Sequence, residues 1–210
     1  MEKKFELTDK FVFNTFGIKL FQIKCTKSFK YAKEGDLGGY VEKDENLDQE
    51  SNAWVSSNAQ VSGNAWVYGD AQVSGNAWVY GNAWVYGNAQ VSGNAWVSGN
   101  AWVYGNAWVS GNAWVYGDAR VSGDAQVSGN ADIENDNNHC GFDCFGSCNR
   151  HTHAYLTKDN KVEITCGCFR GSIEEFEKKV EKTHSGKIYE KQYKAIINAI
   201  KIKFGLTDLI

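Results

Sequence analysis

Residues 64–75 read Asn-Ala-Trp-Val-Tyr-Gly and then Asp-Ala-Gln-Val-Ser-Gly, and this six-residue phrase continues without a break from Asn52 to Ala131. Every phrase holds an Asn or Asp, an Ala, a variable residue, a Val, a second variable residue and a Gly or Ser. Because side chains alternate along a strand, Ala and Val face one side and the two variable residues face the other. Gly, Asn and Asp accept positive φ, so the junction between phrases suits a corner. A strand and a corner every six residues predict a β-solenoid.

The phrase resembles the hexapeptide repeats of left-handed parallel β-helices, in which an aliphatic residue and a small residue four positions later point into a triangular prism. Val67 with Ala71 and Val85 with Ala89 have this spacing. In that family three hexads form one coil, so the resemblance implies a mainly β fold with roughly four to five coils, stacked about 4.7 Å apart, over residues 40–133. The absence of Pro agrees, because each interior strand must donate its N–H groups to the next coil.

The outward positions sort into three unlike faces when the sequence is folded every eighteen residues. Two faces carry aromatic columns, and the third is mostly Gln and Ser. The first column contains Trp66, Tyr68, Trp84, Tyr86, Trp102 and Tyr104 and ends at Arg120; the second contains Trp78, Tyr80, Trp96, Trp114 and Tyr116; the third face contains Trp54, Gln72, Gln90, Trp108 and Gln126. Corner Asn residues, from Asn58 to Asn130 in steps of eighteen, are expected to form a ladder of side-chain amides.

A bare aromatic column would form a larger apolar patch than a monomer usually exposes, because each aromatic side chain carries roughly 150–250 Å² of surface. Three interpretations remain open from the pattern. The aromatic residues of the two columns could stack on one another from coil to coil, could bury themselves against further copies of the chain, or could form a platform for a sugar or nucleotide. The hexapeptide-repeat family is the model for the second interpretation, and it favours a trimer.

Residue types that are missing from the repeat exclude several functions. No His precedes Asn138, whereas hexapeptide acyltransferases typically use a His base on the helix and a long loop extruded from a coil. The repeat contains no Thr, which ice-binding solenoids usually display in ranks. Arg120 is the only basic residue between Asn52 and Asn138, so a nucleic-acid groove on the solenoid is excluded. The repeat therefore predicts a scaffold or an adhesive surface.

Residues 1–39 are expected to form a β cap, because an uncapped solenoid end would offer unpaired backbone groups to other chains. Short strands are predicted at residues 4–8, 11–13 and 18–24. The stretch from Glu34 to Glu42, followed by Asn46-Leu47 and the first Asn-Ala-Trp-Val, resembles the start of the solenoid in YdcK-like hexapeptide-repeat proteins of bacteria and phages. Members of that group are commonly named as transferases by analogy of fold alone, which says little about activity.

Residues 134–210 are expected to form a small α+β domain that is rich in Cys and His. A hairpin is predicted around residues 158–160, followed by two helices, the first of which starts at the capping box Ser172-Ile-Glu-Glu175. Parts of this region, such as Gly146-Ser-Cys-Asn-Arg150, resemble a small C-terminal domain that is attached to several phage-type proteins. Cys25, which lies in the N-terminal region, is expected to be a core residue.

The thiols and imidazoles of this domain allow several kinds of site. Zinc favours Cys and His, and the candidate ligands are Cys144, Cys148, Cys166 and Cys168. The alternatives are free thiols and disulfides, the latter being rare in the cytosol. The start of the first helix beside Arg150, Arg170 and Ser172 is a candidate anion pocket. A nucleophilic Cys168 with His184 or His153 is a further hypothesis.

Composition leads to the remaining expectations. The net charge is −3, no apolar run approaches the length of a membrane span, and no signal sequence follows Met1, so we expect a cytoplasmic protein of a bacterium or a phage-infected cell. The leading hypothesis is a non-enzymatic binding or assembly protein that oligomerises through its aromatic faces and presents its C-terminal domains to a small-molecule ligand or a host protein, which it could sequester or inhibit. The alternative is a hexapeptide-repeat acyltransferase with an active site between subunits.

Overall fold

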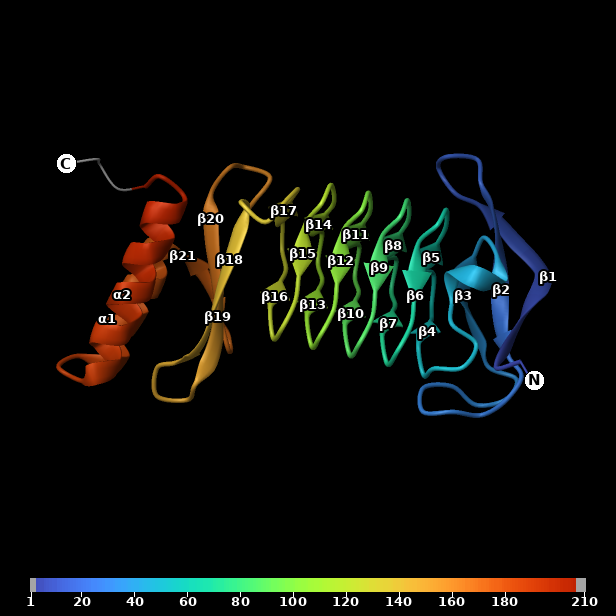
Figure 1. Cartoon of the computed structure of the whole chain (residues 1–210), viewed down its shortest axis with the longest axis horizontal. Helices are drawn as coiled ribbons and strands as arrows, with labels where there is room; N and C mark the ends of the chain where they lie inside the picture. Colours follow the sequence, from blue (N-terminus) through green and yellow to red (C-terminus); the bar gives the residue numbers. More distant parts are fainter. Residues whose placement is uncertain (1–2, 207–210) are drawn as a thin grey trace.

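The computed structural model describes residues 3–206 and shows an elongated body with three parts in series (Figure 1). A β-solenoid lies in the middle, an antiparallel sheet lies at its N-terminal end, and a second sheet with two helices lies at its C-terminal end. Residues 1–2 and 207–210 of the expected end domains lie outside the described residues. No helix within residues 3–206 is long and apolar enough to cross a bilayer.

The solenoid is built from two-residue strands, each of which pairs in parallel with the strand one coil away. Trp66 lies beside Trp84 and Val67 beside Val85, which is a step of eighteen residues. The body is therefore a parallel solenoid of about five coils, with three strands in each coil. Its strands are β4 (Trp54–Val55), β5 (Gln60–Val61), β6 (Trp66–Val67), β7 (Gln72–Val73), β8 (Trp78–Val79), β9 (Trp84–Val85), β10 (Gln90–Val91), β11 (Trp96–Val97), β12 (Trp102–Val103), β13 (Trp108–Val109), β14 (Trp114–Val115), β15 (Arg120–Val121), β16 (Gln126–Val127) and β17 (Asp132–Ile133).

The solenoid core consists of the small apolar residues that the repeat directs inward. Every Ala and Val of the phrase from Ala53 to Val127 is buried, and Ile133 ends the series. At the corners the glycines take positive φ, as at Gly99 with φ +65°, and a Cβ at Gly99 would lie 2.8 Å from the backbone N of Gly117. The corner therefore needs Gly both for its backbone conformation and for the close approach of the next coil.

The expected amide ladder runs along one corner of the solenoid from Asn58 to Asn112. Asn58 donates to Asn76 over 3.2 Å, and Asn76 and Asn94 each donate to the next residue of the ladder. At its C-terminal end Lys158 joins this corner, because its Nζ donates to the carbonyl oxygen of Asn112 over 2.8 Å and its N–H donates to that of Asn130 over 2.9 Å. Two further ladders follow the other corners and end on the carboxylates of Asp118 and Asp124.

The N-terminal cap differs from the expectation in two ways. The strands predicted at residues 4–8 and 11–13 are one strand, β1 (Phe5–Phe13), with a register shift between Leu7 and Phe11. The sheet of β1, β2 (Lys19–Cys25) and β3 (Leu37–Val41) also extends one face of the solenoid, because β3 pairs in parallel with β5, and its buried Phe5 and Ile23 join the solenoid core. The expected boundary after residue 39 therefore falls inside β3. A short helix, η1 (Asp44–Asn46), leads into the first coil.

Lys4 closes the open end of the solenoid from within the cap. Its Nζ donates hydrogen bonds to the carbonyl oxygens of Asp48, Ser51 and Ala53, at 2.6, 2.9 and 2.8 Å. The residue is 6% exposed, and burial lowers the pKa of Lys4 to about 8, so the ammonium still carries its charge at neutral pH. Lys4 thus supplies hydrogen bonds to three carbonyl groups of the first coil, which have no preceding coil to donate to them.

The C-terminal domain is an antiparallel sheet covered on one side by two helices (Figure 1). Its strands are β18 (His139–Phe145), β19 (Arg150–Leu156), β20 (Val162–Cys166) and β21 (Phe169–Ser172), and its helices are α1 (Ile173–His184) and α2 (Ile188–Lys203). The predicted hairpin, which is formed by β19 and β20, both helices and the capping box of Ser172 and Glu175 are confirmed. Tyr155 belongs to the buried core of the solenoid, so the opposite side of this sheet closes the last coil.

Candidate functional site

The aromatic residues of the first two faces form stacked columns along the solenoid. Trp84 and Trp102 lie 5.3 Å apart at an interplanar angle of 4°, and Trp78 and Trp96 lie 5.1 Å apart at 2°. Parallel indole rings at this separation must lie face to face, because coplanar rings side by side would overlap. The ring faces are therefore used within each column, and the ring edges point outward. The structure brings together the nine predicted aromatic residues of these columns, and their role in binding stays a prediction.

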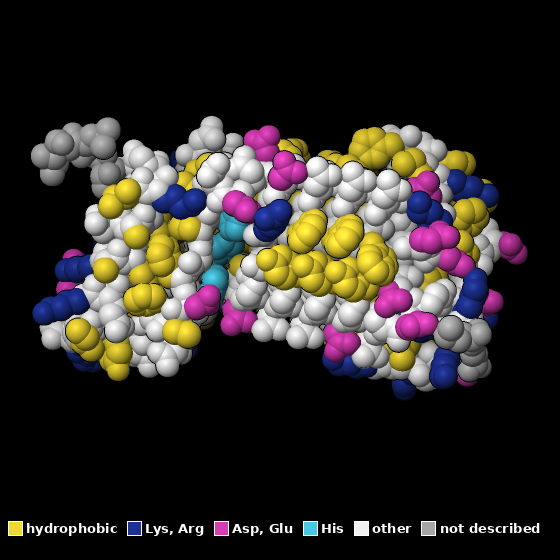
Figure 2. Space-filling view, viewed as in Figure 1, with side chains coloured by type: hydrophobic (Ala, Val, Ile, Leu, Met, Phe, Trp, Pro, Cys, Tyr) yellow, Lys and Arg dark blue, Asp and Glu magenta, His cyan; other side chains and the backbone are white. Residues whose placement is uncertain are grey.

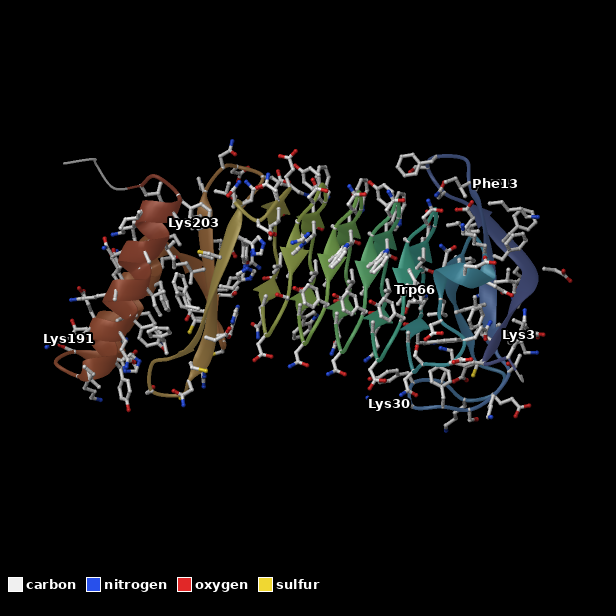
Figure 3. The ribbon with its side chains drawn as sticks, viewed as in Figure 1. Lys3, Phe13, Lys30, Trp66, Lys191 and Lys203 are labelled. Carbon is white, nitrogen blue, oxygen red and sulfur yellow. The ribbon has the colours of Figure 1, made fainter. Side chains whose placement is uncertain are left out.

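Both columns end on contacts within the chain. Trp66 turns across the end of the first column, at 87° to Trp84 and stacked on Tyr68 at 4.2 Å, and Arg120 covers Trp102 at the other end. Figure 3 shows Trp66 on the outer surface of the solenoid, at the side nearest the N-terminal sheet. In the second column, Phe16 and Lys158 occupy corresponding positions next to Trp78 and Trp114.

The outward edges of the columns remain accessible despite this stacking. Trp66 is 38% exposed and Trp114 is 39% exposed, whereas the Trp residues between the column ends are half-buried. Figure 2 shows the first column as a continuous hydrophobic band along the solenoid, with a basic side chain beside one end and acidic side chains near the other. Trp54 on the third face is buried beneath Phe29, and Trp108 stands apart on that face. The first two faces thus present continuous aromatic surfaces and the third does not.

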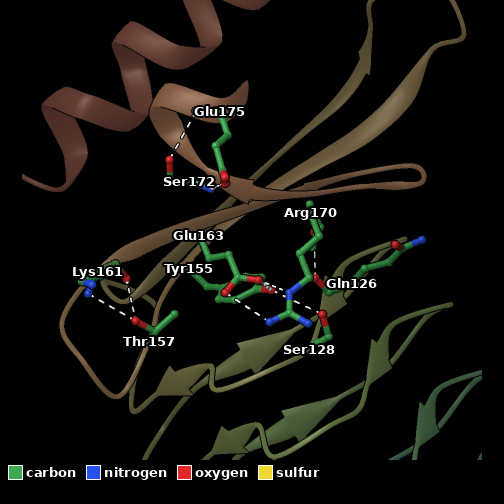
Figure 4. Close-up of polar contacts among 10 residues, drawn as sticks. Gln126, Ser128, Tyr155, Thr157, Lys161, Glu163, Arg170, Ser172 and Glu175 are labelled. Carbon is green, nitrogen blue, oxygen red and sulfur yellow. Dashed lines mark hydrogen bonds and ion pairs between the residues drawn. The ribbon is translucent and has the colours of Figure 1, made fainter. Parts of the chain in front are cut away.

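The structure brings together two of the three residues of the predicted anion pocket, since Arg170 and Ser172 line one cavity and Arg150 does not, and anion binding there stays a prediction. Arg170 pairs with Glu163 on β20 beside the last coil (Figure 4), whereas Arg150 lines a separate cavity. The start of α1 is occupied by its own side chains, since the carboxylate of Glu175 accepts from the N–H of Ser172 and the Ser172 hydroxyl donates to Glu174. Two carboxylates therefore stand where an anion was expected.

The four cysteines proposed as zinc ligands are not arranged as a ligand set. Cys166 is buried at the end of β20, and Cys168 is exposed in the tight turn that follows it, so the pair does not project from one strand. Cys144 and Cys148 are exposed around the turn between β18 and β19. Across residues 3–206, no group of three or more His, Cys, Asp or Glu side chains has a geometry that would hold a metal ion. Zinc binding stays a prediction.

A cavity of about 230 Å³ lies among the β18–β19 turn, the β20–β21 turn and the two helices. Cys148, Cys168 and His184 line it, so the structure does bring the hypothetical nucleophile and one of its two candidate bases to the same cavity. His153, the other candidate base, lies on the opposite side of the sheet against the solenoid. Lys179 and Tyr193 also line the cavity, and the sequence did not indicate this, because both residues were assigned to amphipathic helices without regard to their neighbours.

Three histidines form a row between the last coil and the C-terminal sheet, visible as a cyan strip in Figure 2. His153 lies in the centre and is 1% exposed; its Nε2 is 2.9 Å from Nδ1 of His139, and its ring centroid is 5.6 Å from that of His151. The outer rings lie near carboxylates, His139 near Asp136 and His151 near Asp143. His153 Nδ1 has no hydrogen bond of good geometry, although the Gln126 carbonyl, which accepts from the Thr165 hydroxyl, lies beside it.

This row predicts a loss of stability in acid. Burial lowers the pKa of His153 well below its ordinary value of 6.5, and the neighbouring imidazoles of His139 and His151 lower it further; burial also lowers the pKa of His139, against the opposing effect of Asp136. Below about pH 6.5 these two histidines are protonated in the unfolded chain but stay neutral in the folded chain. The free energy of unfolding should therefore fall by up to about 1.4 kcal/mol per pH unit for each of them.

Urea unfolding of the wild type and of His153→Gln, followed from about pH 7.5 to about pH 5.5, measures this dependence. The Gln variant should start less stable and lose less stability on acidification. Equal losses in the two proteins would show that the row does not control the response. His184, which lies outside the row, provides the matched control as His184→Gln.

The middle of the chain is similar to a known family of repeats. A family model described as the YdcK beta-solenoid repeat matches residues 59–71, 71–87, 89–105, 101–117 and 113–129. A search of curated proteins finds no match. The matched segments all lie within the solenoid, so they carry no information on the two end modules. From residue 59 to residue 129 the chain is thus similar to the YdcK beta-solenoid repeat, which agrees with its stacked two-residue strands.

Proposed function

We propose that the protein is a non-enzymatic binding and assembly protein, whose solenoid joins further copies through its aromatic faces and presents the C-terminal domain to a ligand or a host partner. The observation that carries this proposal is the pair of continuous aromatic columns on neighbouring faces of a nearly uncharged solenoid. The left-handed sense of the coils and a bacterial or phage origin belong to the same proposal. The six-residue strand spacing and the Gly corners support the handedness.

The stacking geometry favours a second copy over a flat ligand as the partner of these faces. A sugar or a nucleobase binds an aromatic side chain through the open face of its ring. The faces of Trp84, Trp96 and Trp102 are already covered by their neighbours in the column. The ring edges, which are one coil apart, form a ridged surface instead. A second copy of the solenoid has ridges with the same spacing, so its ridges can pack into the grooves of the first.

The presence of two columns favours a closed trimer. In a cyclic trimer each copy contacts its two neighbours through different patches, so every copy needs two distinct adhesive surfaces. The columns of β6, β9 and β12 and of β8, β11 and β14 supply two, while the third face, with Gln72 and Gln90, supplies none. Copies joined in this way place their C-terminal domains at the same end of the assembly.

Replacing Trp84 and Trp102 with Gln together tests the proposal. The chain itself carries Gln at the equivalent repeat position in Gln72 and Gln90, so the coils are expected to stay folded. Loss of an interfacial Trp commonly costs about 2 kcal/mol or more, so the dissociation constant should rise at least about 30-fold. Sedimentation velocity over a concentration series measures this constant.

The matched control is Trp108→Gln, which removes a more exposed Trp from the third face. It should leave the dissociation constant unchanged, while circular dichroism checks that each variant is folded. A wild-type protein that sediments as a monomer at every concentration contradicts the proposal, and so does a double Gln variant that assembles as well as the wild type.

A further inference from the structure

The cavity between the turns and helices of the C-terminal domain is lined by positively charged side chains and by no acidic ones. Its cations are Arg150 from β19 and Lys179 from α1, and no Asp or Glu lines it. Within residues 3–206 neither cation forms an ion pair, in contrast to Arg170, which Glu163 neutralises in the neighbouring cavity. The cavity therefore holds positive charge without an internal counterion.

The floor of this cavity is apolar and aromatic. Phe169 and Phe176 pack with ring centroids 5.0 Å apart, and Phe176 meets Tyr193 edge to face at 5.6 Å. His184 stacks on the other side of Tyr193 at 5.5 Å. A ligand that enters the cavity thus meets ring surfaces below and cationic groups at the side, which is the usual composition of a small-molecule site.

Tyr193 adds a hydrogen-bond donor to this floor. The side chain is 5% exposed, and burial raises the pKa of Tyr193 to about 12, so the phenol stays protonated. Within residues 3–206 its one hydrogen-bond partner is the sulfur of Cys166, a weak acceptor, at 3.9 Å, and that sulfur already accepts from Thr152 at 3.3 Å. An oxygen of a bound anion would be a stronger acceptor for this hydroxyl.

We propose that this cavity binds a small organic anion, a carboxylate or a phosphate monoester with an apolar body, whose charge pairs with Arg150 and Lys179 while its body packs on Phe169 and Phe176. The inference rests on the proposed role of the C-terminal domain in presenting a ligand site, and it does not depend on self-association. Charge complementarity selects this occupant, since the lining offers two unpaired cations and no acid to a ligand of any kind.

Protection of thiols tests the proposal in the intact chain. Cys148 and Cys168 are exposed and line the cavity, whereas Cys144 is also exposed but does not line it. Phenyl phosphate and benzoate serve as the anionic probes, and benzamide serves as the neutral probe of similar shape. Alkylation by iodoacetamide is followed at each Cys by peptide mass spectrometry, with and without the probe.

An anionic probe at ten times its dissociation constant should slow the alkylation of Cys148 and Cys168 about tenfold and leave Cys144 unchanged. Protection by phenyl phosphate but not benzoate would assign the site to phosphate monoesters, and the reverse would assign it to carboxylates. Absence of protection by both anions would overturn the proposal, as would equal protection by benzamide.

Variants of the two cations separate charge pairing from apolar packing. Arg150→Gln and Lys179→Gln should each weaken the binding of the anionic probe at least about tenfold. Lys178→Gln, next to Lys179 but outside the cavity, should bind as the wild type does. Unchanged protection in the double variant of Arg150 and Lys179 would contradict the assignment of the charged groups.

The same assay in the Trp84→Gln, Trp102→Gln variant distinguishes this proposal from self-association. Protection of Cys148 and Cys168 in this variant would show that the cavity does not depend on assembly, and protection in a wild type that stays monomeric would retain the cavity and refute assembly through the aromatic faces. Assembly without protection by either anion would retain the aromatic interface and refute the anion site.

Discussion

Replacing Lys4 with Met should lower the free energy of unfolding by about 3–5 kcal/mol, because three carbonyl groups of the first coil lose their donor at once. These are the carbonyl oxygens of Asp48, Ser51 and Ala53, which accept hydrogen bonds from the Lys4 ammonium at the N-terminal end of the solenoid. Met preserves most of the apolar length of the side chain, so the effect isolates the ammonium group. Urea unfolding monitored by Trp fluorescence measures the difference, since Trp54 lies in the same coil.

Lys3→Met is the control, because Lys3 forms an exposed ion pair with Asp44, and pairs of this kind contribute about 1 kcal/mol or less. The two neighbouring lysines should therefore differ by several-fold in their effect on stability. Equal and small effects would show that water or the neighbouring backbone satisfies the three carbonyl groups without Lys4. The cap would then stabilise the solenoid through β-sheet pairing alone.

Replacing Gly99 with Ala should lower the free energy of unfolding by about 2–5 kcal/mol. Part of the loss, about 1–2 kcal/mol, comes from placing a residue with a Cβ at φ +65°. The rest comes from the Cβ itself, which would lie 2.8 Å from the backbone N of Gly117 and 3.0 Å from its carbonyl oxygen, and overpacking of this kind typically costs about 1–3 kcal/mol. The measurement is again the free energy of unfolding in urea.

Gly123→Ala separates the two causes, because Gly123 has φ +64° and no atom within 4 Å of its ideal Cβ position. The backbone conformation is thus nearly the same, and only the contact with a following coil is missing. We expect Gly123→Ala to cost only the backbone part, about 1–2 kcal/mol. If both variants lost the same stability, the close stacking of corner backbones would not be what requires Gly in the repeat.

The solenoid could be predicted from the sequence because its interactions are local and repeated. Each Val and Ala lies inward by strand alternation alone, and the eighteen-residue step then fixes which outward residues meet, such as Trp84 and Trp102. Periodicity gave the columns, but it did not give the orientation of the rings within them. That orientation depends on how neighbouring indoles share the limited space between coils. It determines whether a column presents ring edges or open ring faces to a partner.

The end modules were predicted less well because their key contacts join distant residues. Nothing near Lys4 in the sequence shows that its partners are the carbonyls of residues 48, 51 and 53. Arg150 and Lys179 come from a strand and a helix that lie 29 residues apart in the sequence, so only the packing of the domain shows that they line one cavity. The histidine row had a signal that was missed, since His151 and His153 are two residues apart on one strand and must share a face.

Native mass spectrometry of the protein purified from its own host tests the central claim most directly, because one spectrum reports the stoichiometry and any retained small molecule. The account predicts an oligomer, with the trimer as the main species, that carries an organic anion and loses it when Arg150 and Lys179 are replaced. A monomer with no added mass, recovered under the same gentle conditions, would contradict both the assembly through the aromatic faces and the anion site of the C-terminal domain.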